Sequence, residues 1–161
     1  MKPQLFYGYK PEKEKMKEIS NSSLGSKANG GLWTSTYENG KSEWVQWCEN
    51  AQFFTTDSDD GWLLIPNENS RILTVDNEND FANIYKEYGT HTDYNFPILD
   101  FEKMSRDYDG LHLTSEGQWE TRWSFPYNLH GWDCESTFWF RWCFDEVKYI
   151  GEIKIEICNE T

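Results

Sequence analysis

The chain has 161 residues, the length of one domain, and its 28 acidic and 15 basic side chains give a formal net charge of −13. A negative field repels phosphate backbones, so this charge argues against sequence-independent binding of DNA or RNA. No stretch approaches the roughly 18 apolar residues that a membrane-spanning helix needs, so we expect no membrane association.

In chain order, the first half of the sequence predicts a strand at 4–9, a helix at 11–20, a loop at 21–31, a strand at 31–37 and a helix from Ser42 onward. Pro11 occupies the favoured first turn of the proposed helix, while Ser, Asn and Gly dominate the loop. β-branched and aromatic residues indicate the strand at 31–37. Two short apolar runs, 61–66 and 71–75, flank a turn-prone Asn-Glu-Asn-Ser stretch and predict a hairpin or a sequential strand pair.

The second half predicts helices at 76–88 and 100–107, followed by strands at 108–114, 136–144 and 147–157. Apolar residues repeat every three or four positions in the first of these helices and alternate in the last strand, through Ile153, Ile155 and Ile157. Strands outnumber helices and do not alternate with them, which favours an α+β fold with a largely antiparallel or mixed sheet. No linker divides the chain, so we expect residues 1–161 to form a single domain.

Cysteine and histidine spacing gives no sign of a metal site or a disulfide framework. The four cysteines are scattered without a CxxC pair, and the three histidines are not spaced as ligands. We therefore interpret the cysteines as buried thiols in a reducing compartment. Residues 1–15 are rich in charged side chains and contain no apolar signal core, so we expect a cytoplasmic protein. Glycine motifs of the P-loop or Rossmann type are absent from the sequence.

Two short stretches contain candidate functional residues. In Leu-Trp-Thr-Ser-Thr-Tyr (32–37), strand alternation places Thr34 and Thr36 on one face and the rings of Trp33 and Tyr37 with Ser35 on the other. Hydroxyls beside large rings suit a flat heteroaromatic ligand, although Thr is also simply a good strand former. Both interpretations stay open at this point.

The second stretch is Gly-Trp-Asp-Cys-Glu-Ser-Thr-Phe-Trp (131–139), in which two carboxylates precede an aromatic run. Asp133 and Glu135 are two positions apart, so in a strand they would share a face. Two close carboxylates in an aromatic setting are typical of a functional site. The alternative is that one or both point into solvent or cap the preceding loop.

Together these stretches resemble the ADP-ribosyltransferase-like superfamily, in its small free-standing bacterial or phage form. The order matches: Leu-Phe-Tyr-Gly-Tyr (5–9), then Gly-Leu-Trp-Thr-Ser-Thr-Tyr (31–37) leading into a helix, then Tyr-Asp-Gly-Leu-His-Leu-Thr (108–114), then Trp-Asp-Cys-Glu-Ser-Thr-Phe-Trp (132–139). The resemblance implies a split sheet whose cleft binds NAD as the substrate. It also implies that Glu135 is the catalytic residue.

The same resemblance implies the residues that bind NAD: Tyr7, Gly8, Trp33, Thr34, Ser35, Thr36 and Tyr37. Ser35 would support the ribose, and Tyr37 or Trp33 would stack on nicotinamide. The first strand of the superfamily commonly carries an Arg or a His for the NAD phosphate or ribose, whereas Tyr7, Tyr9 and Lys10 stand here. The pyrophosphate needs a cation, and the candidates are Lys10, Lys27, Arg71 and Arg141.

The expected function is therefore NAD-dependent transfer of ADP-ribose to a macromolecular acceptor, either protein or nucleic acid. Small free-standing members of the superfamily often act as toxins or effectors in conflict between phage and bacterium, so phage defence and an antitoxin or inhibitor protein are further expectations. NAD hydrolysis would use the same site with water as the acceptor. A different class of function is a non-catalytic acidic protein that binds a basic protein partner.

Overall fold

The computed structural model describes residues 1–23, 27–53 and 58–155, and it is an α+β fold with a mixed seven-stranded sheet and four α-helices. The strands of the sheet are β1 (Gln4–Tyr7), β2 (Leu32–Thr36), β3 (Asp60–Pro66), β4 (Ile72–Val75), β7 (Gly110–Leu113), β8 (Ser136–Trp139) and β9 (Phe144–Glu152). Their order is β4-β7-β8-β2-β1-β3-β9. The β4–β7 pair is parallel and the other neighbours are antiparallel.

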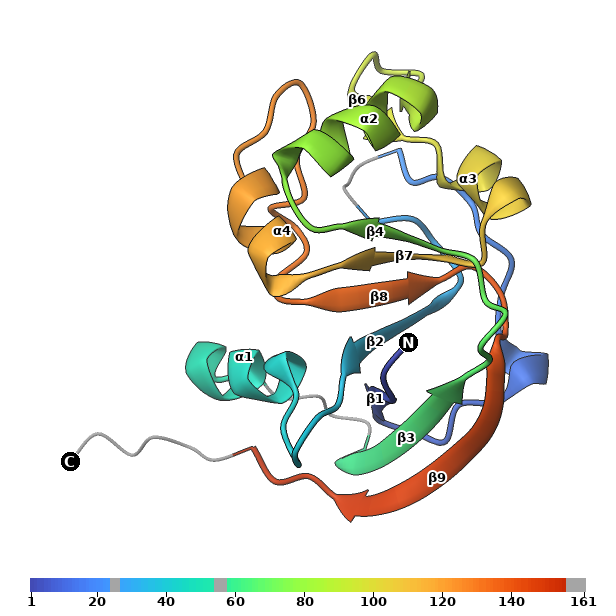
Figure 1. The fold of residues 1–161 in the computed structure, drawn as a ribbon, viewed down its shortest axis with the longest axis vertical. Coiled ribbons are helices and arrows are strands. Elements are labelled where there is room, and N and C mark those ends of the chain that lie inside the picture. Colours follow the sequence, from blue (N-terminus) through green and yellow to red (C-terminus); the bar gives the residue numbers. More distant parts are fainter. Residues whose placement is uncertain (24–26, 54–57, 156–161) are drawn as a thin grey trace.

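Four helices surround this sheet: α1 (Glu43–Ala51), α2 (Glu78–Tyr88), α3 (Phe101–Asp107) and α4 (Ser115–Thr121). Figure 1 shows α2, α3 and α4 around β4, β7 and β8 in the upper half, while α1 follows β2 into the lower half. A separate two-stranded sheet joins β5 (Gly89–His91) to β6 (Pro97–Leu99). None of the helices in the described part of the chain has the length and apolarity that a bilayer crossing requires.

The aromatic run of β8 is buried on both of its faces. Phe138 belongs to the larger core, which lies between the upper strands and the helices, and Trp139 belongs to a smaller core with Leu64 and Phe144. Consecutive strand residues point to opposite faces, so two adjacent rings enter two different cores. β8 therefore ties the upper and lower parts of the sheet together.

The expected strands at 4–9, 31–37 and 108–114 and the helices at 76–88 and 100–107 are confirmed, with ends that differ by at most two residues. The helix expected at 11–20 is wrong, because only a 3-10 turn, η1 (Lys13–Lys15), forms there, and it buries no residue. The lysines and glutamates of this segment offer no apolar stripe that could seat a helix on the core.

The runs at 61–66 and 71–75 do form strands, but the expected pairing between them is wrong. β3 lies between β1 and β9, whereas β4 pairs with β7 at the far end of the sheet. The strand expected at 136–144 ends at Trp139, and β9 begins earlier than expected, at Phe144, and ends at Glu152. Ile153 and Ile155 follow β9, and Ile157 lies outside the described residues.

Helix α4 has no counterpart among the sequence predictions because its seven residues lack an apolar repeat. Its beginning is fixed by Thr114, whose hydroxyl accepts a hydrogen bond from the Gly117 amide at 3.1 Å. Gly117 is buried, and a Cβ atom added there would overlap the carbonyl group of Val75. The missing side chain thus lets α4 pack directly on the end of β4.

Gly117→Ala is expected to lower the free energy of unfolding by about 1–3 kcal/mol, because a methyl group must be forced against the backbone of β4. The usual effect of this substitution inside a helix has the opposite sign, a gain of about 1 kcal/mol. Urea denaturation of both proteins measures the difference. A more stable variant would contradict the close packing of α4 on β4.

Candidate active site

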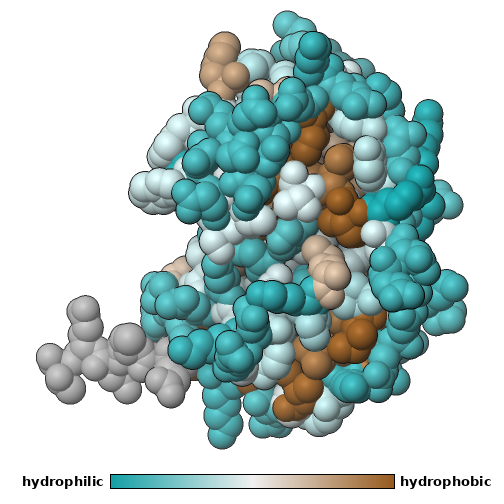
Figure 2. All heavy atoms as spheres, in the orientation of Figure 1, coloured by the Kyte–Doolittle hydropathy of each residue, from teal (hydrophilic) through white to brown (hydrophobic). Residues whose placement is uncertain are grey.

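A cleft of about 1090 Å³ lies where the end of β2, the beginning of α1 and the beginning of α4 meet. Its wall includes Thr36, Glu43, His112, Ser115 and Glu135. In Figure 2 the surface is indented between the upper half of the molecule, which contains α4, and the lower half, which contains α1. The cleft is therefore open to solvent on one side and backed by the central strands of the sheet.

The carboxylate of Glu135 is buried in the wall of this cleft, with 6% of the residue exposed. Ser35 Oγ donates a hydrogen bond to Oε2 at 2.8 Å, and the Thr36 amide donates to the same oxygen at 2.9 Å. The Thr36 hydroxyl donates to Oε1 at 2.7 Å. These donors replace the water that burial removes from the carboxylate.

Strand register explains why residues a hundred positions apart meet here. β2 and β8 are antiparallel neighbours, with Trp33 opposite Phe138 and Thr34 opposite Thr137. Continuing this register by two positions brings Thr36 opposite Glu135, which directly precedes β8. The aromatic residues of β8 fix the register, because a slip by one residue would exchange its two buried faces.

His112 on β7 lies beside Glu135. Its Nδ1 atom is 2.8 Å from Thr137 Oγ1 and 3.5 Å from Glu135 Oε1. Burial lowers the pKa of His112 below its ordinary value, while the negative charges of Glu135 and Asp76 oppose that change. The site therefore favours a neutral imidazole next to the carboxylate.

His112 is expected to make stability depend on pH on the acid side of its ordinary pKa of 6.5. Since its folded-state pKa is lowered, the unfolded chain binds the proton more readily, and stability falls as the pH drops below that value. His112→Asn is expected to reduce this loss, by at most about 1.4 kcal/mol per pH unit. Unfolding in urea between pH 5 and 8 measures both slopes, and equal slopes would contradict the prediction.

Glu43, the first residue of α1, is a second carboxylate in the cleft. Its Oε2 atom accepts a hydrogen bond from the Glu135 amide at 3.1 Å, and Oε1 accepts one from the Ser115 hydroxyl. Glu43 thereby connects α1, α4 and the beginning of β8. The sequence contained one hint of this residue, a Ser-Glu pair at the start of a predicted helix.

The residues predicted to bind NAD divide between two hollows. Thr36 and Tyr37 line the main cleft together with Glu135. Four of the other predicted residues line a second hollow of about 230 Å³. The predicted residues in this smaller hollow are Tyr7, Trp33, Thr34 and Ser35. Ser35 links the two, because it lines the smaller hollow while its hydroxyl donates to Glu135, in the wall of the main cleft, at 2.8 Å.

Trp33, Thr34 and Gly8 have structural partners. Trp33 stacks on Phe138 with ring centroids 4.4 Å apart, and the hydroxyl of Thr34 accepts from Trp139 Nε1 at 2.8 Å. Gly8 is not among the residues that line either hollow, and its backbone binds the β3 strand through Asp60 and Trp62.

Asp133 and Glu135 do not share a strand face, so that expectation is wrong. β8 begins at Ser136, and both acidic residues precede it. Asp133 lines the smaller hollow and forms an ion pair with Lys27 at 3.1 Å, whereas Glu135 lines the main cleft. The chain turns between them instead of continuing as a strand.

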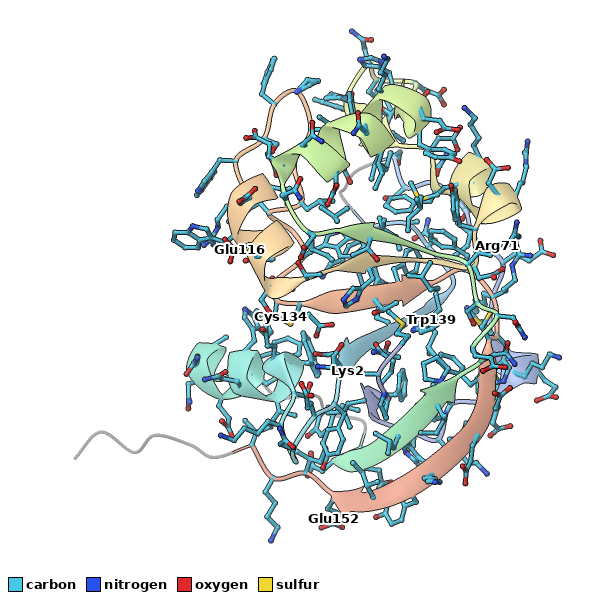
Figure 3. All side chains as sticks on the ribbon, viewed as in Figure 1. Lys2, Arg71, Glu116, Cys134, Trp139 and Glu152 are labelled. Atoms are coloured by element: carbon cyan, nitrogen blue, oxygen red, sulfur yellow. The ribbon has the colours of Figure 1, made fainter. Side chains whose placement is uncertain are left out.

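None of the four candidate cations for a pyrophosphate lines the main cleft among the described residues. Arg71 and Arg141 both pair with Asp109, Lys27 pairs with Asp133, and Lys10 lies over the ring of Trp62. The cations in the cleft wall are Lys2 and Lys41. In the view of Figure 3, Lys2 lies between α1 and β1; its side chain is exposed, and its Nζ atom is 2.7 Å from Glu38 Oε2.

Within the described residues, no three His, Cys, Asp or Glu side chains lie together in a way that could hold a metal ion. The chemical groups gathered in the cleft are instead the four carboxylates of Glu38, Glu43, Glu49 and Glu135, the imidazole of His112, several hydroxyls and two lysines. No protein-family model, curated protein or solved structure matches the chain.

Proposed function

We propose that the protein is an NAD-dependent ADP-ribosyltransferase with the fold of that superfamily. The observation that supports this proposal best is the Glu135 carboxylate, which is buried in the wall of a large cleft and held there by hydrogen bonds from Ser35 and Thr36. The resemblance in the sequence requires a hydroxyl-bearing strand and a late glutamate at one site, and these are the two segments that meet.

The chemistry needs a fixed negative charge. Cleavage of the bond between nicotinamide and ribose releases neutral nicotinamide and develops positive charge on the sugar. A carboxylate placed beforehand stabilises that charge without reorganising during the reaction. The donors from Ser35 and Thr36 hold the Glu135 carboxylate in one position. A nucleophile of the acceptor then bonds to the sugar carbon and loses its proton.

The volume of the cleft, one ring in its wall and two cations support NAD as the substrate. Its volume of about 1090 Å³ lies just above the roughly 300–1,000 Å³ of small-molecule sites, which leaves room for a dinucleotide. Of the two rings proposed to stack on nicotinamide, Tyr37 lines this cleft and Trp33 does not. Lys2 and Lys41 are the cations available for the pyrophosphate, provided that Lys2 exchanges Glu38 for phosphate.

The arrangement of strands also supports the proposed fold. β2 lies at the centre of the sheet between β1 and β8, and it leads into α1, in the order that the resemblance implies. The alternative of NAD hydrolysis uses the same groups with water as the acceptor.

The test measures, by chromatography, the release of nicotinamide from NAD by the purified protein. A thermal unfolding series at increasing NAD concentration measures binding. Release, with or without an added acceptor extract, would support the proposal, and free ADP-ribose as the sole other product would identify a hydrolase. NAD at 100 times its Kd should stabilise the fold by about 2.7 kcal/mol. No release and no stabilisation would favour a non-catalytic binding protein.

A further inference from the structure

Three large aromatic side chains are exposed on α4 and the segment that follows it. Trp119 is 67% exposed, Trp123 is 75% exposed and Phe125 is 94% exposed. We call Trp119, Trp123 and Phe125 the α4 aromatic surface. Grouped exposed rings mark interaction sites, and Trp is enriched among the residues that dominate binding energy.

The two indole rings of this surface are held in place without being covered. The guanidinium carbon of Arg122 lies 5.5 Å from the Trp119 ring centroid and 5.8 Å from that of Trp123. His130 stacks on Trp123 with ring centroids 5.0 Å apart and an interplanar angle of 22°. A partner would therefore meet rings that are already ordered, which reduces the entropy cost of binding.

Apart from Arg122, the charged side chains of α4 and of the beginning of α2 are acidic. Glu116 and Glu120 lie on α4, and Figure 3 shows Glu116 at the outer edge of that helix. The beginning of α2 lies against α4, because the Glu78 amide donates to Glu120 Oε2 at 2.8 Å, and Asp76, which precedes α2, accepts from the Thr114 hydroxyl at 2.7 Å. Glu78 and Asp76 therefore add two further carboxylates. Indole rings and carboxylates both attract cations, and the carboxylates repel a phosphate backbone.

Helix α4 connects the α4 aromatic surface to the candidate active site. Ser115, at the beginning of α4, lines the cleft and donates to Glu43. The helix has seven residues, which span about 10 Å. A chain bound along α4 can therefore place a neighbouring residue in the cleft.

We propose that the α4 aromatic surface binds a basic segment of the acceptor protein, with Arg or Lys side chains against the parts of the Trp119 and Trp123 rings that Arg122 and His130 leave exposed. The role as an acceptor site rests on the proposed function, whereas the binding of a basic segment does not. On this proposal the acceptor is a protein, and α4 is the element that presents it to Glu135.

The experiment measures binding of three fluorescent probes to the full chain: a peptide of alternating Arg and Gly, its Glu-Gly counterpart, and an oligonucleotide of thymidines of equal length. The Arg-Gly peptide is expected to bind best and to weaken with salt. Trp119→Ala/Trp123→Ala is expected to weaken it at least tenfold, and Glu116→Lys several-fold. Tyr149→Ala is the matched control, since it removes an exposed ring (54%) from β9 and should leave binding unchanged.

Tighter binding of the oligonucleotide than of the Arg-Gly peptide would overturn the proposal, as would equal binding by the double variant and Tyr149→Ala. Circular dichroism verifies that the double variant is folded, and Trp123→Phe, which keeps a ring, should retain most of the affinity. The proposed function is tested separately, by measuring nicotinamide release in the absence of peptide. The double variant should keep that release, and Glu135→Gln should keep peptide binding.

Discussion

Glu135→Gln is expected to reduce nicotinamide release from NAD by roughly 100- to 1,000-fold in kcat, the loss typical of removing one electrostatic stabiliser of a transition state. Glutamine has the same shape but no charge to oppose the positive charge on the sugar. Its amide group also cannot accept hydrogen bonds from all the donors that Ser35 and Thr36 supply. The rise in unfolding temperature that NAD produces is expected to differ between the variant and the original protein by only a few tenths of a degree. The substitution affects the transition state more than it affects binding.

Asp133→Asn is the matched control, since it neutralises a carboxylate only two residues earlier. Asp133 lines the smaller hollow and pairs with Lys27, so its loss should change kcat by no more than about threefold. Equal losses in the two variants would place the chemistry elsewhere, and so would full activity in Glu135→Gln.

Trp139→Ala is expected to lower the free energy of unfolding by about 3–5 kcal/mol, the range for truncating a fully buried aromatic ring. Trp139 has no exposed surface, and it packs with Leu64 and Phe144 in the smaller core. Its indole nitrogen also donates to Thr34 Oγ1 at 2.8 Å, and Thr34 in turn donates to Gln4 Oε1. Both the cavity and the broken hydrogen bond contribute to the loss.

Urea denaturation at neutral pH measures this effect, with Trp119→Ala as the comparison. Trp119 is 67% exposed, so its truncation should change stability by no more than about 0.5 kcal/mol. Similar losses in the two variants would contradict the central position of β8 between two cores. Trp139→Phe should lie between them, because it keeps part of the packing and loses the hydrogen bond.

The sequence predicted that Ser35 and Glu135 lie at one site, because the resemblance implies that a hydroxyl-bearing strand and a late glutamate share a cleft. Its geometry was not, because it depends on the register of β2 against β8. The separate positions of Asp133 and Glu135 depend on where β8 begins, and alternation alone does not locate that residue. Element ends are the part of a fold that local sequence determines least.

Glu43, His112 and Lys2 were missed for a related reason. Each comes from a different element, and only the assembled sheet brings α1, β7 and the segment before β1 to one cleft. The turn residues between 66 and 71 likewise predicted a change of chain direction, but they did not show which strand each of the two flanking strands would pair with. Strand pairing is decided by non-local packing, so β3 and β4 joined different neighbours.

β9 has a consequence for how the protein behaves at high concentration. It is nine residues long, it ends the order of strands in the sheet, and Figure 1 shows it curving around the lower half. Long free edges can act as templates on which copies of a chain add as further strands. Exposed charges at Asp145, Glu146, Lys148 and Glu152, together with irregular register against β3, make such a template poor, since an incoming copy would meet repulsion and a bent backbone. The edge is therefore protected from fibril-like growth by its own side chains.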